Sequence, residues 1–206
     1  MKEEEFSAAA ASWCCWIAEA LWKPPTPDML ATSQVLAPLE VDGGLREACE
    51  LVKRLSQKVD ARSVKAMAVD YTALFCGFDI NSSFPYESVY RSEGRLMMQE
   101  ASAQVKREYE RAGFDWREWG ATEPPDHFST ELRFVAFLLG KTASGEDSPV
   151  EKAPYRQLLE EFVSRHVAAW GAPFCSDFET RAETEFFRAV GMLARAVLLH
   201  LPGAVR

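Results

Sequence analysis

Apolar residues recur every three or four positions along most of the chain, and no segment between turns alternates strictly between apolar and polar residues. This spacing places side chains on one face of an α-helix, so the pattern predicts an all-α fold. The first predicted helix covers residues 5 to 22 and ends at the sequence KPPTP, and a short second helix begins at Pro27 with Thr26 as its cap. One face of the first helix carries Phe6, Trp13, Ile17 and Leu21.

Three more helices are predicted before residue 113. The third covers about 44 to 59, and the fourth runs from Val64 to Gly77, a residue type that commonly ends helices. The next is the longest, from Glu87 to about Ala112, with charged residues on its exposed faces and Gly113 at its end. The buried faces of the third and fourth helices carry Leu45, Val52, Leu55, Val59, Val64, Met67, Tyr71, Leu74 and Phe75.

The apolar spacing in the C-terminal part of the chain predicts three helices. One follows the sequence EPPDH and runs to about Lys141, and another covers about 149 to 169. The last is expected to begin near Ser176 and Glu179, which have the spacing of a capping box. Its buried face carries Phe186, Val190, Leu193 and Val197.

The segment GFDWREWGATEPP, residues 113 to 125, interrupts the helical pattern. It is rich in Gly, Pro and Trp and has no sustained period, which is typical of a hinge or a functional loop. We therefore expect a helical bundle with an N-terminal lobe, 1–112, a hinge loop, 113–125, and a C-terminal lobe, 126–206. The alternative is one compact domain, because a chain of 206 residues with 48% hydrophobic residues can bury a single core.

Charge and composition exclude several classes of function. A net charge of -8 disfavours nucleic-acid binding, which depends on clustered Lys and Arg. No export signal is evident, because acidic residues stand where the basic start of a signal peptide would lie, and no apolar run reaches the ~18 residues that span a bilayer. The five cysteines form no CxxC pair and are expected to be reduced, mostly buried thiols.

The sequence EPPDHFSTELRF, residues 123 to 134, holds the clearest candidate chemistry and allows three interpretations. His127 and Glu131, four residues apart, would supply two metal ligands on one helix face, which is too few for a site. Asp126 and His127 would form an acid/base pair, although neighbouring residues on a helix point about 100° apart. In the third interpretation Pro124 and Pro125 fix the entry to a helix, and Asp126 lies at the positive end of its dipole.

Four segments in order narrow these alternatives. DYTALFCG (70–77), FPYESVYRSE (84–93), REYERAGF (107–114) and EPPDHFSTELRFVAFLL (123–139) together resemble the TorD/DmsD/NarJ family, whose members are all-helical cytoplasmic chaperones for complex iron-sulfur molybdoenzymes. The resemblance covers about residues 64 to 140. It departs from the family at Tyr86, where members often have Trp, and at the second proline, Pro125.

The resemblance implies a cytoplasmic protein of TorD-like fold that catalyses no reaction and has no cofactor or metal. It would bind the twin-arginine signal peptide or the immature catalytic subunit of a molybdopterin oxidoreductase and assist cofactor insertion and assembly before export. It would bind no nucleic acid, would not insert stably into a membrane, and would be a monomer or a domain-swapped dimer. Two rivals stay open: a metal-dependent or acid/base enzyme centred on Asp126 and His127, and a helical scaffold that binds a folded partner.

Carried over to the matching positions, the resemblance predicts a peptide groove with an apolar wall and a polar rim. We expect Asp126 to be the main partner of a basic peptide group and His127 to bind or to orient the loop. Asp126→Asn or His127→Ala should then weaken client capture while leaving the melting temperature near that of the wild type. The predicted site residues are Tyr71, Leu74, Phe75, Pro85, Tyr86, Ser88, Tyr90, Glu123, Pro124, Asp126 and His127.

Overall fold

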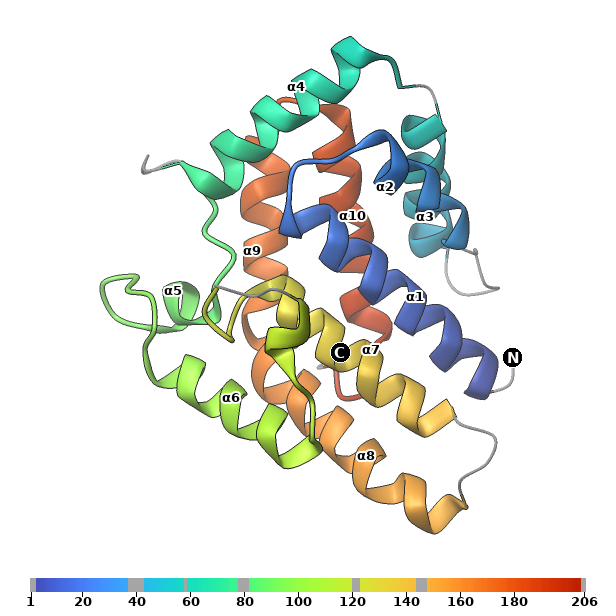
Figure 1. The fold of residues 1–206 in the computed structure, drawn as a ribbon, viewed down its shortest axis with the longest axis vertical. Helices are drawn as coiled ribbons and strands as arrows, with labels where there is room; N and C mark the ends of the chain where they lie inside the picture. The colour runs from blue at the N-terminus through green and yellow to red at the C-terminus, as the bar shows by residue number, and fades with distance from the viewer. Residues whose placement is uncertain are drawn as a thin grey trace.

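The computed structural model describes residues 3–36, 43–57, 59–77, 82–119, 123–143 and 148–204. Within these ranges the chain forms helices and no β-strand, which confirms the predicted all-α fold (Figure 1). The elements are α1 (Glu3–Trp22), α2 (Pro27–Ala31), η1 (Thr32–Val35), α3 (Gly43–Gln57), α4 (Ala61–Tyr71), η2 (Thr72–Cys76), α5 (Glu87–Arg91), α6 (Glu100–Ala112), η3 (Trp116–Trp119), α7 (Phe128–Ala143), α8 (Pro149–Phe162), η4 (Val163–Val167), α9 (Ala168–Arg181) and α10 (Glu185–His200).

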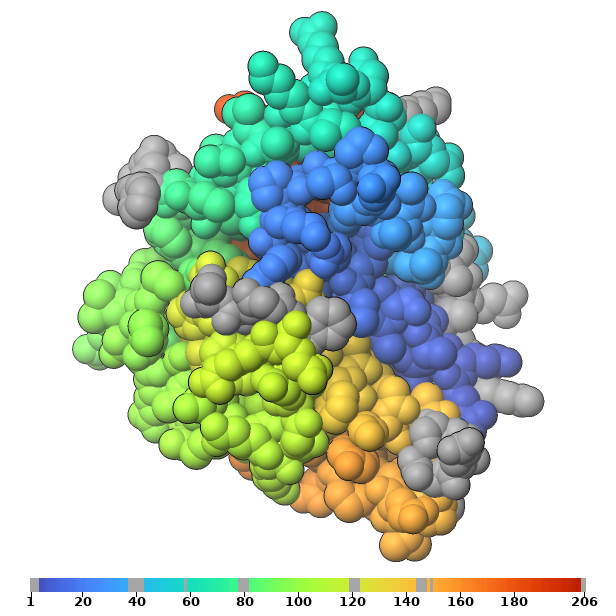
Figure 2. Space-filling view, viewed as in Figure 1, coloured from blue at the N-terminus to red at the C-terminus, as the bar shows by residue number. Residues whose placement is uncertain are grey.

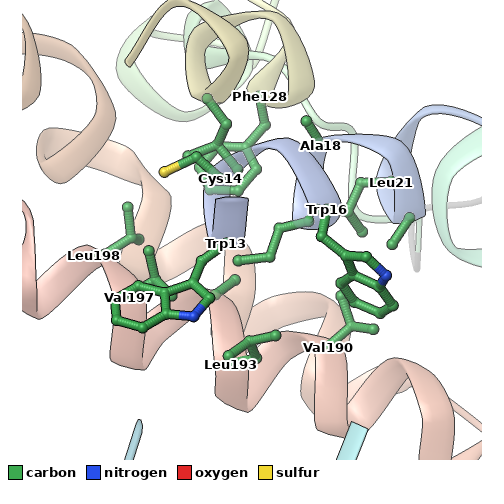
Figure 3. Packing of buried hydrophobic residues seen from close by; sticks show 14 of the residues in the cluster. Trp13, Cys14, Trp16, Ala18, Leu21, Phe128, Val190, Leu193, Val197 and Leu198 are labelled. Atoms are coloured by element: carbon green, nitrogen blue, oxygen red, sulfur yellow. The ribbon is translucent and has the colours of Figure 1, made fainter. Parts of the chain in front are cut away.

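Helix α1 lies at the centre of the packing, between α7 on one side and α10 on the other (Figure 1). Its Trp13 packs over Leu193 and Val197 of α10, and its Cys14 lies near Phe128 of α7 (Figure 3). On the face shown in Figure 2, the blue N-terminal segment lies between the teal α4 and the gold α7. The apolar faces predicted from the sequence therefore meet in the core.

One cluster of buried apolar residues runs from Ala10 to Leu201 and draws on helices from both sides of the predicted hinge. The burial of Trp13, Ile17 and Leu21 confirms the predicted face of α1, since none of the three has exposed surface. The division into two lobes stays a prediction, and residues 120–122 of its hinge lie outside the described residues.

The predicted single helix from 87 to 112 is wrong, because a loop at 92–99 separates α5 from α6. Three residues of this loop have positive φ angles, namely Gly94 (81°), Arg95 (55°) and Met98 (57°), a backbone conformation that an α-helix does not contain. The Ser92 hydroxyl also accepts a hydrogen bond from the Leu96 N–H (3.1 Å), which holds the turn. Gly113 does end α6, with a φ of 69°.

The predicted start of the last helix at Ser176 is also wrong. A π-helical turn at η4 carries α8 directly into α9, so Ser176 lies inside a helix that continues to Arg181. The last helix begins after Thr184, whose hydroxyl accepts from the Phe187 N–H (3.4 Å). The buried Asp70 carboxylate supports this start from a distant part of the chain by accepting from the Thr184 N–H (2.8 Å).

Gly77 follows η2 as predicted, but its φ of -71° is not left-handed. Glycine suits the position for a different reason. A Cβ atom there would lie 2.5 Å from the Ser82 hydroxyl oxygen and 3.1 Å from the Ala73 carbonyl oxygen, so the Ser82 side chain would have to move to admit it.

Candidate functional site

The structure brings two of the sequence motifs together, although 40 residues separate them. Tyr86 and His127 form an isolated antiparallel bridge. On either side of it, the Glu87 N–H donates to the Asp126 carbonyl (3.0 Å) and the Phe128 N–H donates to the Pro85 carbonyl (2.8 Å). Residues 85–87 and 126–128 therefore form one unit, from which α5 and α7 both start.

A cavity of about 420 Å³ lies beside this unit. Most of its lining residues were predicted from the sequence, and Trp22 and Cys76 are the additions. Trp22 was not predicted as a site residue. The sequence places it at the end of the first helix, but its contact with residue 127, far along the chain, forms only in the folded protein. The lining residues are Trp22, Tyr71, Phe75, Cys76, Pro85, Tyr86, Glu123 and His127.

Aromatic rings form the apolar wall of the cavity. The centroid of the His127 ring lies 5.0 Å from that of Trp22 and 5.2 Å from that of Tyr86, and both pairs meet edge to face. On the opposite side Tyr71 and Phe75 form a further edge-to-face pair, 5.3 Å apart. Such contacts fix ring orientations, so the cavity has a defined shape before any ligand arrives.

The imidazole of His127 is buried and neutral. Burial, and then the nearby Arg133 guanidinium, lower its pKa from 6.5 to about 3. Nδ1 accepts a hydrogen bond from the Ser129 N–H (3.1 Å), so the ring proton lies on Nε2. No described residue accepts from Nε2, which leaves this N–H available as a donor.

Glu123 supplies the carboxylate of the cavity. The Tyr86 hydroxyl donates to its Oε2, and burial together with this carboxylate raises the pKa of Tyr86. Glu123 is half-buried, and no Lys or Arg of the described ranges forms an ion pair with it. The cavity thus combines aromatic walls with a carboxylate that has no cationic partner in the described part of the chain.

Asp126, in contrast, is buried and contacts the start of α5. It has no exposed surface, and its Oδ2 accepts from the Ser88 N–H (2.9 Å) and from the Ser88 hydroxyl. It therefore caps α5 rather than α7, the helix that the sequence interpretation had assigned to it. Its Oδ1 has no hydrogen-bond partner among the described residues.

The remaining predicted site residues lie away from the cavity lining. Leu74 is in the core, and Ser88 is occupied by Asp126. The Tyr90 hydroxyl donates to Asp177 (3.0 Å), and its ring packs on Trp170 of α9. Pro124 is half-buried beside Glu123, and its carbonyl accepts from the His127 N–H (3.2 Å). The peptide-binding role of all these residues stays a prediction.

Glu131, the second residue of the hypothetical metal pair, faces away from His127. Its buried Oε2 accepts from the Trp170 indole N–H (3.0 Å), and burial followed by the Glu87 charge raises its pKa. Among the residues described, no three His, Cys, Asp or Glu side chains gather as metal ligands. In the same ranges no helix is long and apolar enough to cross a membrane.

Comparison with known proteins identifies a family whose sequence model matches this chain. The family model described as nitrate reductase delta subunit matches residues 39–176, which is more than half of the chain. The match includes both paired motifs and the cavity residues except Trp22.

Individual relatives carry chaperone names. The chaperone protein TorD of Vibrio cholerae is 30% identical over 138 residues, which cover 65% of this chain and 61% of the relative. The perchlorate reductase assembly chaperone of Dechloromonas aromatica is 30% identical over 140 residues, covering 64% and 60% of the two chains. The selenate reductase assembly chaperone of Thauera selenatis is 33% identical over 76 residues, covering 36% and 39%. The chain thus spans about three fifths of the length of the TorD relative.

Proposed function

The chain belongs to the family described as nitrate reductase delta subunit, and from that premise we propose that it is an assembly chaperone for a molybdoenzyme reductase. It binds the immature catalytic subunit in the cytoplasm through an arginine-bearing leader peptide and assists cofactor insertion before export. The names of the TorD, perchlorate reductase and selenate reductase relatives support the chaperone role. The cavity supports the leader peptide as ligand.

The observation that carries this proposal is the Glu123 carboxylate beside an aromatic cavity, which accepts from the Tyr86 hydroxyl but has no Lys or Arg partner among the described residues. A twin-arginine leader offers two guanidinium groups followed by an apolar segment. A guanidinium binds a carboxylate through charge-assisted hydrogen bonds, and an apolar segment is stabilised by burial against aromatic rings. Both features lie within one cavity of about 420 Å³, which suits one or two peptide side chains.

Within this proposal Glu123 replaces Asp126 as the partner of the arginine. Asp126 is fully buried and its carboxylate is held by Ser88, so a peptide would have to open the α5–α7 unit to reach it. Glu123 needs no such opening because it lines the cavity. His127 is neutral, its Nε2–H has no acceptor among the described residues, and it donates to a peptide carbonyl.

The affinity is expected to be moderate. Burial of apolar side chains and one charge-assisted contact favour binding, while ordering a flexible peptide opposes it. Moderate affinity suits a chaperone that must release its client after maturation.

Co-purification tests the role directly. The tagged chain would be produced with the catalytic subunit of a molybdopterin oxidoreductase from the same organism, once with the leader and once without it. We expect capture of the leader-bearing immature subunit and little capture of the mature enzyme. Equal capture of mature, cofactor-loaded enzyme would instead identify a scaffold for a folded partner and contradict the proposal.

A further inference from the structure

A second hollow lies at the other end of α5. Two depressions of about 480 Å³ and 320 Å³ share Arg91 and Gln104 on their walls, so they join into one trough between α5, α6 and η4. Neither depression includes a residue of the cavity beside Glu123.

Three arginines from three different elements line this trough: Arg91 at the end of α5, Arg107 on α6 and Arg165 in η4. Arg91 is fixed, because its guanidinium donates to the Glu87 carboxylate and to the Arg165 carbonyl (2.8 Å). The guanidinium groups of Arg107 and Arg165 are exposed, and within the described ranges neither has a hydrogen-bond or ion-pair partner. Two acids, Glu100 and Glu108, also line the trough, but the Glu108 carboxylate pairs with Arg111 (3.4 Å) and the Glu100 carboxylate accepts from the Gln104 amide (2.9 Å). Among the described residues, Arg107 and Arg165 are therefore the cations of the trough that have no ion-pair partner.

The π-helical turn η4 shapes this wall. A π turn shifts the backbone hydrogen bonds by one residue, and such turns occur frequently at functional sites. Here the turn leaves the Arg165 carbonyl to Arg91, while it buries His166 with Nδ1 2.8 Å from the Glu87 carboxylate. This side of the trough is therefore anchored to buried groups, while the Arg165 side chain stays exposed.

Exposed apolar residues lie beside the trough. In the loop between α5 and α6, Leu96 is 57% exposed, Met97 41% and Met98 72%. The residues that flank this loop, Ser92 and Gln99, line the trough themselves. A run of three exposed apolar side chains on a surface loop is unusual, and flexible methionines suit surfaces that accept varied partners.

We propose that this trough is a second docking surface, which binds an extended segment of the client polypeptide that carries carboxylates and apolar side chains. The proposal rests on the proposed chaperone function. Arg107 and Arg165 bind the carboxylates, Gln104 donates to the peptide backbone, and the Leu96–Met98 loop covers the apolar side chains. The exposed apolar side chains of the loop favour a peptide over a small anion, because an anion would contact the arginines alone.

The two surfaces then complement opposite charges of one client. The cavity beside Glu123 accepts a basic group at the start of α5, and the arginine trough accepts acidic groups at its end. Because no lining residue is shared, occupation of one surface does not block the other. An unfolded client held at both surfaces would be retained more strongly than a free leader peptide.

Fluorescence anisotropy of the full chain with labelled peptides tests this surface. The probe is a short peptide of alternating glutamate and leucine, and the comparison probe replaces glutamate with lysine. We expect the glutamate peptide to bind more tightly, and the Arg107→Gln/Arg165→Gln variant to weaken its binding by roughly three- to tenfold, with a smaller effect in high salt. The matched control, Arg46→Gln/Arg62→Gln, changes exposed arginines on α3 and α4 and should leave binding unchanged.

Each contrary outcome would overturn the proposal. Equal binding of the two peptides, or equal loss in the control variant, would show that charge at the trough is not recognised. Competition by inorganic pyrophosphate without peptide binding would identify a small-anion site instead. A twin-arginine peptide titrated against the same variants separates the two surfaces: unchanged leader binding together with lost glutamate-peptide binding supports the trough, whereas lost leader binding in the Arg107/Arg165 variant would refute two independent surfaces.

Discussion

The two carboxylates that flank Pro124 and Pro125 differ in how deeply they are buried. Glu123 lines a cavity and keeps its charge available, whereas Asp126 is fully buried and holds the first turn of α5 through Ser88. Sequence alone favoured Asp126 as the peptide contact, since both acids precede the same helix. The structure changes the expected effect of its substitution.

We now expect Asp126→Asn to destabilise the fold. The amide loses the charge-assisted hydrogen bonds to Ser88, and its NH₂ group is placed in a buried position, so the free energy of unfolding should fall by about 1–3 kcal/mol. Urea denaturation at neutral pH measures this change. If the free energy of unfolding stayed at the wild-type value while client capture fell, Asp126 would be a binding residue after all.

His127 should make stability depend on pH. In the folded chain its pKa is about 3, while in the unfolded chain it is near 6.5. Between these values the unfolded chain binds more protons, so the free energy of unfolding falls as the pH is lowered through this window, by up to about 1.4 kcal/mol per pH unit.

The variant His127→Asn tests this dependence. Asparagine can still accept from the Ser129 N–H but does not titrate, so its loss of stability between pH 6.5 and about pH 3 should be shallower than that of the wild type. The measurement is the slope of the free energy of unfolding against pH. Loss of the His127 ring contacts lowers stability by a similar amount at every pH, so it leaves this slope unchanged. Parallel slopes in the two proteins would contradict the assignment of a buried neutral imidazole.

At the scale of elements, close helix packing depends on particular glycines. A Cβ atom at Gly191 of α10 would lie 2.8 Å from the Glu179 Cβ and 3.3 Å from the Cys175 carbonyl oxygen of α9. Gly191→Ala should therefore push the two helices apart and destabilise the fold by about 1–3 kcal/mol.

The matched control is Gly140→Ala, at a helical position of α7 where no atom lies within 4 Å of an added Cβ. Alanine is the better helix former there, so this variant should gain up to about 1 kcal/mol. Thermal unfolding of both variants gives the comparison. A Gly191→Ala protein that gained stability like the control would show that α9 and α10 are not in close contact.

Element boundaries also show what a sequence reveals. The apolar spacing around Trp13, Ile17 and Val190 predicted buried helix faces correctly, because this signal repeats over several turns. The break at 92–99 was missed, since one glycine, Gly94, within a charged helical pattern is only a weak sign that the helix ends. The apparent cap at Ser176 misled for a related reason: a local spacing says nothing of the π turn that continues the preceding helix.

At the scale of the whole molecule, long-range pairing creates the site. The motifs at 84–93 and 123–139 were recognised separately, but their pairing through Tyr86 and His127 and the arrival of Trp22 from α1 depend on the packed fold. Family resemblance therefore located most lining residues of the cavity, while only the three-dimensional structure distinguished the accessible Glu123 from the buried Asp126.

Calorimetry with a twin-arginine peptide tests whether Glu123 binds an arginine of the client leader. Glu123→Gln should weaken binding about fivefold, the loss expected for an ion pair that solvent partly screens. The control Glu50→Gln, which changes an exposed acid on α3, should have no effect. A peptide with glutamines in place of both arginines should bind the wild type and Glu123→Gln equally. Equal affinity of the arginine peptide for wild type and Glu123→Gln would show that Glu123 does not bind the leader.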